Sequence, residues 1–407
     1  MKLAKQQEVG VVQMGSTRRD FLKLCTYMGA AAVVTYYAAD IKKVFAETAA
    51  ANGGKVHLVW LQAAGDSGCT ISMLQASNPD LISAVQNLSL SADFWQTLMT
   101  PDYDLGWVSA GYDQEPDSQI PLMNAAFGSA PVDVLVVEGA IPVGTPKGSG
   151  TQPGDYCKIG TYNGADVNAY TLVQKLAAKA SYVISVGQCS AFGGCPAGNG
   201  NLTGAIAVTK ALAQAGVTTK NQVINMAGCP AQPDWVLITL ASVLQGYTPA
   251  LDTEGRPTAF YSRVIHDECP RRGYYDAGQF ASGFDDPECL WELGCKGPIT
   301  LSSCAETKWN GGTGMCTLGG PMCWGCMHPS FPDAPTSGFF EALPHFPGID
   351  IPTLEVAGAA AVIVGAGLAI GLQVKSKKGD GAAKKEAAPP ADSAKAQGKG
   401  TATGSPA

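Results

Sequence analysis

The feature that most restricts this chain is a concentration of soft metal ligands between His266 and Cys326. These 61 residues hold seven of the 13 cysteines and one of the four histidines. Thiolates select zinc, copper(I) or iron-sulfur clusters over hard cations, and cluster cysteines are typically scattered along loops with one close pair. The ligands form two sets of four and predict two metal centres: His266, Cys269, Cys289 and Cys295, then Cys304, Cys316, Cys323 and Cys326.

Two other interpretations of these cysteines are a disulfide framework and a pair of zinc sites. Exported cysteines are usually oxidised, and the start of the chain indicates export. However, 13 is an odd number, and a chain of 407 residues needs no disulfides to complete a core. The segment from Thr17 to Lys23 is a twin-arginine signature, and an apolar stretch from Leu24 to Ala39 follows it. That route carries proteins already folded, often with cofactors loaded, which favours metal centres over disulfides.

The composition is that of a globular protein that does not bind nucleic acid. With 46% hydrophobic and 15% charged residues, the chain can bury one or two substantial cores. A net charge of -7 repels phosphate backbones, and the sequence has no basic stripe interleaved with aromatic residues. Residues 1–51 are predicted to be the twin-arginine signal peptide, which takes no part in the fold.

The C-terminal part predicts a transmembrane anchor and a disordered tail. Val356 to Val374 is a run of 19 residues in which Gln373 is the only strongly polar side chain. As a helix it spans about 28 Å, close to the hydrocarbon thickness of a bilayer, and lysines follow at once. We expect an anchor over residues 355–375 and disorder over 376–407, where Ala, Gly, Lys, Pro, Ser and Asp dominate. A buried alanine-rich helix is the alternative for the apolar run.

Four short apolar runs in the middle of the chain have the Val/Ile/Leu character of strands buried on both faces. They are Val56–Leu61, Val132–Val137, Tyr182–Val186 and Val223–Asn225. Helical patterns such as 170–180 and 205–215 lie between them. The economical fold is therefore α/β, with a parallel sheet and covering helices.

Chemically active residues follow each of these predicted strands. Asp66 and Cys69 come after the first strand, Glu138 after the second, Cys189 after the third and Cys229 after the fourth. The carboxyl ends of the strands of an open parallel sheet gather at one edge, where ligands bind. Three cysteines and one carboxylate are therefore expected to converge as a third candidate metal site.

Six short segments of the sequence form a combination that is specific to one protein family. They start at Val56 (VHLVWLQ), Val137 (VEGAIP), Gly187 (GQCSAFGG), Ala227 (AGCP), His266 (HDECPR) and Leu293 (LGCKGP). Together they resemble the small subunit of membrane-bound nickel-iron uptake hydrogenases, over roughly residues 54–345. The resemblance implies a flavodoxin-like parallel-sheet domain over residues 52–250 and a mostly irregular iron-sulfur domain over 251–350. It also implies three clusters in a row, which carry electrons from a nickel-iron centre in a separate large subunit.

The same resemblance assigns ligands to the three clusters. Cys69, Cys189 and Cys229 match the ligands of the proximal 4Fe-4S cluster, nearest the large subunit. The set that begins at His266 matches the distal 4Fe-4S cluster, with the histidine as its outermost and least buried ligand. Cys304, Cys323 and Cys326 match the medial cluster.

The proximal site departs from the family pattern. Where the family usually has Cys-x-x-Cys, this chain reads Asp66-Ser67-Gly68-Cys69, so one thiolate is missing. We favour Asp66 as the fourth ligand, which resembles the actinobacterial-type, oxygen-insensitive subgroup. The rivals are Cys195 and, less favoured, Cys157.

The medial site departs as well. Many family members have proline near position 316 and hold a three-iron cluster, whereas Cys316 supplies a fourth thiolate here. A 4Fe-4S medial cluster is therefore implied, with a 3Fe-4S cluster and a free buried cysteine as the alternative.

The function implied is that of the electron-transferring subunit of a hydrogenase on the periplasmic or outer face of the cell membrane. The expected partners are the large subunit, a membrane quinone or cytochrome b acceptor, and a second heterodimer. The alternatives are an iron-sulfur electron carrier outside the hydrogenases and a structural zinc protein of the same fold.

Overall fold

The computed structural model describes residues 56–77, 80–82, 84, 90–99, 119–244, 247–333 and 338–343. All of them belong to one compact unit, Met1–Pro347. The predicted signal peptide, the apolar run at 356–374 and the tail lie outside these residues. Within the described part of the chain, no helix is both long and apolar enough to cross a bilayer.

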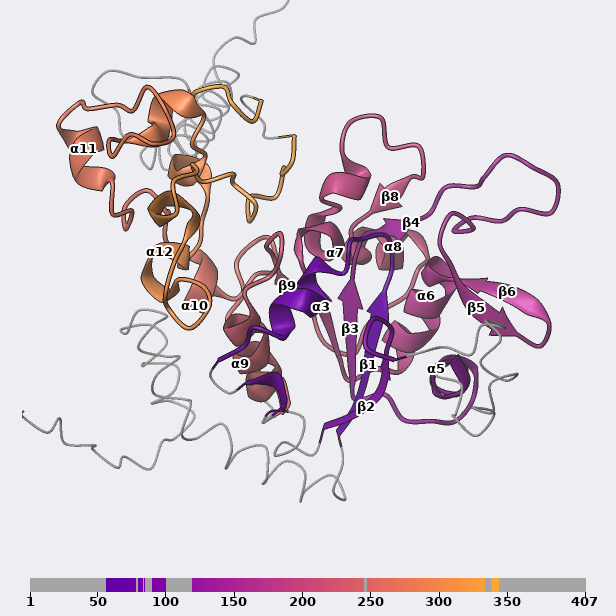
Figure 1. Cartoon of the computed structure of the whole chain (residues 1–407). Coiled ribbons are helices and arrows are strands. Elements are labelled where there is room, and N and C mark those ends of the chain that lie inside the picture. Colours follow the sequence, from indigo (N-terminus) through magenta and orange to yellow (C-terminus); the bar gives the residue numbers. More distant parts are fainter. Residues whose placement is uncertain are drawn as a thin grey trace, which may run out of the picture. The chain divides into compact units, whose positions relative to one another are not determined.

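Five parallel strands form the central sheet in the order β2-β1-β3-β7-β9 (Figure 1). Their bounds are β1 Val56–Gln62, β2 Leu90–Trp95, β3 Val134–Glu138, β7 Tyr182–Val186 and β9 Ile224–Met226. Numbered along the chain, this order is 2-1-3-4-5, the order of flavodoxin-like sheets. The register pairs Gln62 with Glu138, and Glu138 with Val186, so the carboxyl ends of the three central strands are level.

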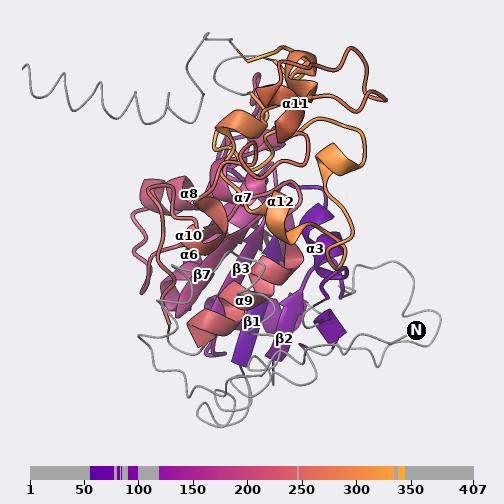
Figure 2. The same ribbon diagram turned by 90° about the vertical axis from the view of Figure 1, so that its left-hand side faces the viewer.

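Helices cover both faces of the sheet. On one face, α3 (Gly68–Met73) and α9 (Pro233–Leu244) pack against side chains such as Trp60 and Val136 (Figure 2). On the other face, α5 (Gln119–Phe127), α6 (Ala169–Lys179) and α8 (Val208–Gln214) pack against side chains such as Leu135. Strands covered on both sides need apolar side chains at successive positions, which explains their continuous apolar runs.

The predicted elements agree with these bounds, with two corrections. The four predicted strands correspond to β1, β3, β7 and β9, and the first helical pattern corresponds to α6. The second pattern is too long, because Ala205–Ile206 form strand β8, which pairs with β4 (Ile141–Pro142), before α8 begins. Edge strand β2 is not predicted, since Ser91 and Asp93 interrupt its apolar character.

Short elements complete this half of the chain. They are the hairpin β5 (Lys158–Tyr162) and β6 (Ala165–Asn168), helix α7 (Gln188–Phe192) and the 3-10 helix η2 (Cys195–Ala197). Helix α7 directly follows β7, and η2 follows α7 after two glycines, so Cys189 and Cys195 both lie beyond the carboxyl end of that strand.

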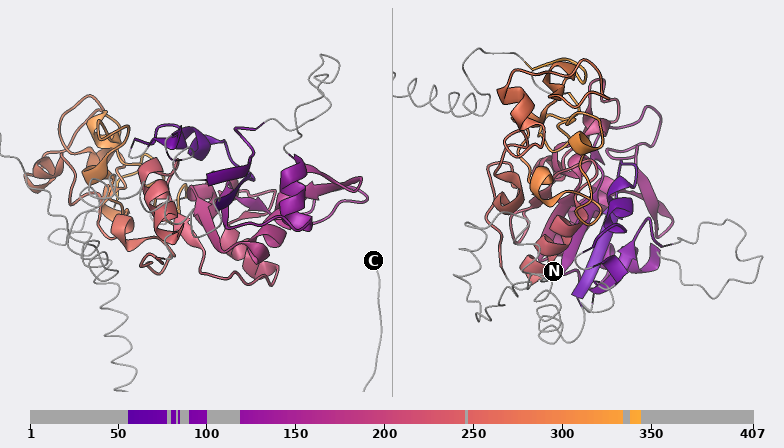
Figure 3. Two further views of the ribbon diagram at one scale, coloured as in Figure 1. Left: turned by 90° about the horizontal axis from the view of Figure 1, so that it is seen from below. Right: turned by 60° about the vertical axis from the view of Figure 1, so that its left-hand side comes forward.

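The part after β9 is mostly irregular in the described residues (Figure 3). Its helices are short: α10 (Thr258–Tyr261), α11 (Arg272–Asp276), α12 (Cys304–Thr307), and the 3-10 helices η3 (Leu290–Leu293), η4 (Gly297–Ile299) and η5 (Cys316–Leu318). The described residues after β9 therefore have little regular secondary structure, and the assignment of metal ligands to them stays a prediction.

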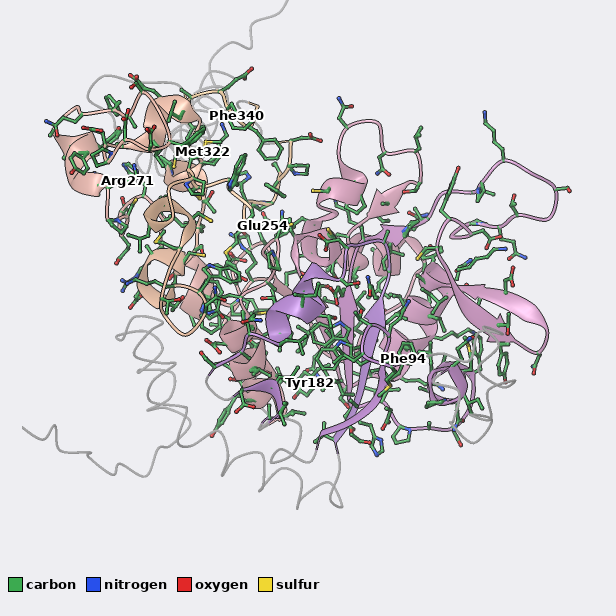
Figure 4. The ribbon with its side chains drawn as sticks, in the orientation of Figure 1. Phe94, Tyr182, Glu254, Arg271, Met322 and Phe340 are labelled. Atoms are coloured by element: carbon green, nitrogen blue, oxygen red, sulfur yellow. The ribbon has the colours of Figure 1, made fainter. Side chains whose placement is uncertain are left out.

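Residues 338–343, here called the C-terminal strap, close over this irregular part. Trp324 packs edge-on against Phe339 and Phe340, with ring centroids 5.5 Å apart in both pairs. The Nζ of Lys296 donates a hydrogen bond of 2.7 Å to the carbonyl oxygen of Glu341. Figure 4 shows Phe340 in the same irregular part as Met322 and Arg271. The strap therefore contacts two separate cysteine-bearing loops.

Candidate metal centres

Three cysteines meet at the carboxyl edge of the sheet, as predicted. Cys69 is buried on α3, and a Cβ placed on Gly187 after β7 would lie only 2.4 Å from its Sγ. Burial raises the pKa of Cys189 to about 12, and the neighbouring thiolates of Cys229 and Cys195 act in the same direction. Burial also raises the pKa of Cys69 well above its ordinary value, with a smaller contribution from Cys189 and Cys229. The three thiols therefore lie close enough for the charge of one to raise the pKa of another.

The carboxylate of Glu138 fixes the start of α3, and with it Cys69. Its Oε1 accepts hydrogen bonds from the backbone N–H groups of Cys69 and Thr70, both at 3.0 Å. Its Oε2 accepts from Trp60 Nε1 at 2.8 Å and from Thr70 Oγ1 at 2.5 Å. The sequence pattern predicts a carboxylate at this edge but does not indicate its role as an anchor. Both carboxylate oxygens of Glu138 are occupied by these hydrogen bonds, which hold the helix that carries Cys69.

Asp66 and Cys195 both lie beside the three cysteines. Asp66 is exposed, its Oδ1 accepts a hydrogen bond of 2.9 Å from Gly68 N, and its charge acts on Cys189 and Cys229. Cys195 is exposed at the start of η2 and acts on the same two thiols. Both candidates for a fourth proximal ligand are therefore close to the other three.

Cys157 lies elsewhere. It is half-buried against the core on the opposite face of the sheet, among the residues packed with α6. Burial raises its pKa to about 11, and no other cysteine contributes to that shift. The structure thus does not bring Cys157 to the proximal cysteines.

The four predicted medial ligands line one cavity of about 640 Å³. Cys304, Cys316, Cys323 and Cys326 all contribute to its wall, and Cys229 of the sheet edge contributes as well. The rest of the lining is apolar or neutral and includes Trp309, Met315 and Trp324, but no charged side chain. A cavity that gathers four soft sulfur donors without a hard ligand fits an iron-sulfur cluster.

The surroundings of the medial thiols penalise charge and favour the protonated form. Burial raises the pKa of Cys304 to about 11, while the hydroxyl of Ser302, which donates to its Sγ at 3.1 Å, acts in the opposite direction. Burial also raises the pKa of Cys323 well above its ordinary value. Cluster binding here would release these protons, since thiolate is the ligating form.

The distal set gathers around α11 and η3. The thiolate of Cys269 acts on Cys289, and both act on Cys295, whose pKa burial raises to about 11. The His266 backbone N–H donates to the carbonyl of Gly297, beside Cys295. The four predicted distal residues therefore belong to one region.

The expectation that His266 is the least buried ligand is wrong for this chain. Its side chain is only 5% exposed, less than that of any other residue in the distal set. Tyr275 packs edge-on against the imidazole at 4.5 Å, and Trp291 lies 6.0 Å away. This aromatic cover, which comes from α11 and η3, could not be foreseen from the spacing of the cysteines.

Neighbouring sites are in contact with each other. Cys229 acts on Cys326 across the boundary between the sheet and the irregular part: its backbone N–H lowers the pKa of the Cys326 thiol, and the charge of its thiolate raises it. On the far side of the medial cavity, the backbone N–H of Lys296 donates to the carbonyl of Cys323 at 2.8 Å, directly after Cys295. The three cysteine sets thus form a continuous series from the sheet edge to α11.

Neither a site for a single metal ion nor a disulfide is found among the described residues. Among the described residues, no group of three His, Cys, Asp or Glu side chains is close enough to hold one metal ion. All twelve cysteines of that part of the chain are free thiols, so the disulfide interpretation is not supported there.

Comparison with known proteins identifies relatives along most of the chain. The family that comprises the C-terminal part of the NiFe/NiFeSe hydrogenase small subunit matches residues 261–339, and the family described as NADH ubiquinone oxidoreductase, 20 Kd subunit, matches residues 67–243. The small subunit of F420 non-reducing hydrogenase I from Methanosarcina mazei is 33% identical over 86% of this chain and 91% of its own length. The periplasmic [NiFeSe] hydrogenase small subunit of Desulfomicrobium baculatum is 33% identical over 81% of this chain and its whole length.

A solved structure agrees with this result. The actinobacterial-type NiFe-hydrogenase from Ralstonia eutropha H16 superposes with a TM-score of 0.61 and 27% identity, over 76% of this chain and 90% of that chain.

Proposed function

Because the chain belongs to the small subunits of nickel-iron hydrogenases, we propose that it carries electrons from hydrogen oxidation in a large subunit to an acceptor. It is then a subunit of an oxidoreductase of class EC 1.12 whose nickel-iron centre lies in the partner. The observation that supports the proposal most directly is the continuous series of three cysteine sets, from the sheet edge through the medial cavity to α11. A lone zinc site needs no such series.

The residues of this chain position and insulate the electron path. An iron-sulfur cluster, when bound, takes up and releases one electron with little change in geometry. The strand ends and α3 hold the first set of ligands, and the second set lines a cavity whose wall carries no charged side chain. Buried hydrogen bonds, such as that from Ser302 to Cys304, stabilise thiolate charge and raise the potential at which an electron is accepted.

We assign three clusters to these sets. The proximal 4Fe-4S cluster binds Cys69, Cys189, Cys229 and Asp66, and the distal 4Fe-4S cluster binds the set that begins at His266. The medial cluster is 4Fe-4S with Cys316 as its fourth ligand, or 3Fe-4S without it. The position of Cys316 on the wall of the medial cavity supports the first form.

The choice between Asp66 and Cys195 can be tested in the purified heterodimer. Asp66→Cys should preserve about 12 irons, the sum for three four-iron clusters, yet shift the proximal potential. If Asp66→Ala changes neither the iron content nor that potential, Asp66 is not a ligand and Cys195 takes its place. Cys195→Ser is the matched variant, and it should leave both properties unchanged.

We further propose that the enzyme is exported by the twin-arginine route and anchored at the outer face of the membrane by residues 355–375. The periplasmic location named for the Desulfomicrobium relative supports export. A quinone or cytochrome b in the membrane would accept the electrons, and two heterodimers would assemble together. Deletion after Pro352 should release active enzyme into the soluble fraction; retention in the membrane would place the anchor elsewhere.

The deciding experiment for the function is purification with quantitation of metals and electron paramagnetic resonance. A large subunit that co-purifies and contains nickel, together with three iron-sulfur signals, supports the hydrogenase. Iron-sulfur signals without a nickel-containing partner favour an electron carrier of another class. A colourless protein that contains zinc excludes both redox functions.

A further inference from the structure

A buried arginine lies beside the boundary between the sheet and the irregular part. Arg256 is only 3% exposed, although arginine is mostly a surface residue unless its charge is paired. Asp252 supplies the pair, because its Oδ2 accepts a hydrogen bond from Arg256 Nε at 2.8 Å. The Oδ1 of the same carboxylate accepts from the backbone N–H of Arg256, also at 2.8 Å. The direction of the guanidinium group is therefore fixed within its own turn.

This turn is bound to β9, the edge strand that precedes Cys229. The backbone N–H of Asn225 donates to the carbonyl of Gly255 at 2.8 Å, and Asn225 Nδ2 donates to the carbonyl of Glu254 at 2.7 Å. Asn225 is buried and stands four residues before Cys229 in the chain. Arg256 is therefore held close to the strand end that leads to the proximal set.

From that turn, the guanidinium group reaches the medial set. Its Nη1 donates a buried hydrogen bond of 3.0 Å to the carbonyl of Met327, the residue after Cys326. Met327 is completely buried, and its Sδ lies 3.9 Å from the Sγ of Cys304. A buried carbonyl needs a donor, and Arg256 provides one here. This hydrogen bond therefore fixes the backbone directly behind Cys326.

Tyr261 adds a second connection across the same boundary. Its hydroxyl donates to the carbonyl of Ala227 at 2.7 Å, two residues before Cys229. The Cζ of Arg256 lies 5.3 Å from the centre of the Tyr261 ring, an arrangement in which the cation and the ring attract each other. Arg256 thus contacts one group that is bound in front of Cys229 and another that stands behind Cys326.

We propose that Arg256 is a positioning residue for electron transfer, which holds the Cys326 side of the medial centre at a fixed separation from the Cys229 side of the proximal centre. The inference rests on the proposed function, which supplies both centres. An electron tunnels between two centres at a rate that falls steeply as their separation grows. Buried, charge-assisted hydrogen bonds are stronger than exposed ones, so they restrict that separation closely.

Three variants separate the two connections. Arg256→Met removes the charge and the donors and keeps an apolar stem, whereas Arg256→Lys keeps the charge and a single donor group. Tyr261→Phe keeps the ring beside Arg256 and removes the hydrogen bond to Ala227. Thr258→Ala is the matched control, because the hydroxyl of Thr258 donates to the carbonyl of Ala250 at 3.2 Å and does not reach either cysteine set.

The purified heterodimer gives three measurements. They are the iron content, the splitting of the paramagnetic resonance signals by the magnetic interaction between the proximal and medial centres, and the ratio of dye reduction to hydrogen-deuterium exchange. Exchange at the large subunit needs no electron transfer to the medial centre. Arg256→Met should keep its iron, change the splitting and lower the ratio several-fold. Arg256→Lys should lie between Arg256→Met and the unmodified protein, Tyr261→Phe should show a smaller change in the same direction, and Thr258→Ala should show none.

Other outcomes overturn the inference. An unchanged splitting together with an unchanged ratio in Arg256→Met contradicts it. Loss of iron and of both activities in Arg256→Met and Tyr261→Phe alike would give the two residues a purely structural role. If only Arg256→Met loses iron, Tyr261→Phe decides, and unchanged values in that variant refute the proposal. If the unmodified heterodimer shows no iron-sulfur signals at all, it is the proposed function that fails.

Discussion

Replacing Glu138 by glutamine should destabilise the sheet edge by a predictable amount. The carboxylate accepts four hydrogen bonds, two from backbone N–H groups at Oε1 and two from Trp60 and Thr70 at Oε2. A glutamine can direct its oxygen to only one of these pairs. If the oxygen faces the two backbone groups, the amide NH₂ faces the indole N–H of Trp60, and one buried donor is left without an acceptor.

The Thr70 hydroxyl cannot readily replace the acceptor that the indole N–H of Trp60 loses in that variant. It already accepts a hydrogen bond of 3.0 Å from Trp95 Nε1, and Trp95 is stacked on Trp60 with centroids 4.1 Å apart. An orphaned buried donor costs about 2 kcal/mol. For a folded unit of this size, that corresponds to a fall of roughly 3–4 °C in the apparent unfolding temperature. Glu138→Ala orphans all four donors and should cost up to about four times as much.

The assay is thermal unfolding of the purified heterodimer, followed by tryptophan fluorescence, with iron content measured on the same samples. Glu254→Gln is the matched control, since Glu254 is an exposed carboxylate in the same chain. The control should unfold within about 1 °C of the unmodified protein, the range expected of a surface substitution. If Glu138→Gln also unfolds within that range, the four hydrogen bonds do not hold α3 in place.

Three further predictions follow from the same structure. Gly187→Ala should abolish the paramagnetic resonance signal of the proximal cluster while the medial and distal signals persist, since its Cβ would meet a cysteine sulfur at 2.4 Å. The control Gly216→Ala, at a glycine with a positive φ but open space, should keep all three signals. Three intact signals in Gly187→Ala would refute the clash. Alkylation of Cys157, whose pKa burial raises to about 11, should be about 100-fold slower at pH 8 than in the denatured chain. The native state holds the Cys157 proton more tightly than the unfolded state does. The contribution of this proton to the free energy of unfolding is therefore fully present below the unfolded pKa of 9.0 and is lost as the pH rises toward about 11. Equal alkylation rates in the native and denatured chains would contradict this. Truncation after Asp333 removes the C-terminal strap and should lower the iron content, whereas truncation after Pro352 should not; equal iron in both would make the strap dispensable.

The sequence contains most of the information on the sheet and on the ligand sets. The continuous apolar runs locate four of its five strands, because strands covered on both faces are mostly apolar at successive positions, with Ser185 and Asn225 as buried exceptions. The cysteine spacing groups the cysteines into the regions where the structure places them, and their role as ligands stays a prediction. Edge strand β2 escapes prediction because an edge position tolerates Asp93, which pairs with His57 at 2.7 Å instead of facing the core.

What the sequence does not reveal depends on tertiary contacts. Lys296 reads as a surface residue within LGCKGP, and only its contacts with the medial loop and the strap account for its burial. Likewise, the cover over His266 comes from Tyr275 and Trp291, which no short motif connects to it. Spacing predicts which residue types can ligate, whereas the dielectric surroundings of each ligand follow from the packing of segments distant in sequence.

The contact between Cys229 and Cys326 has a consequence for assembly. It lies where the two halves of the chain meet, beside a hydrogen bond of 2.6 Å from Gln188 to the carbonyl of His328 and one of 3.0 Å from Arg256 to the carbonyl of Met327. A chain whose second half has not yet docked would therefore lack the medial wall next to Cys229. Electrons reaching the sheet edge of such a protein would have no onward route through this chain, so docking of the two halves is a condition for electron transfer.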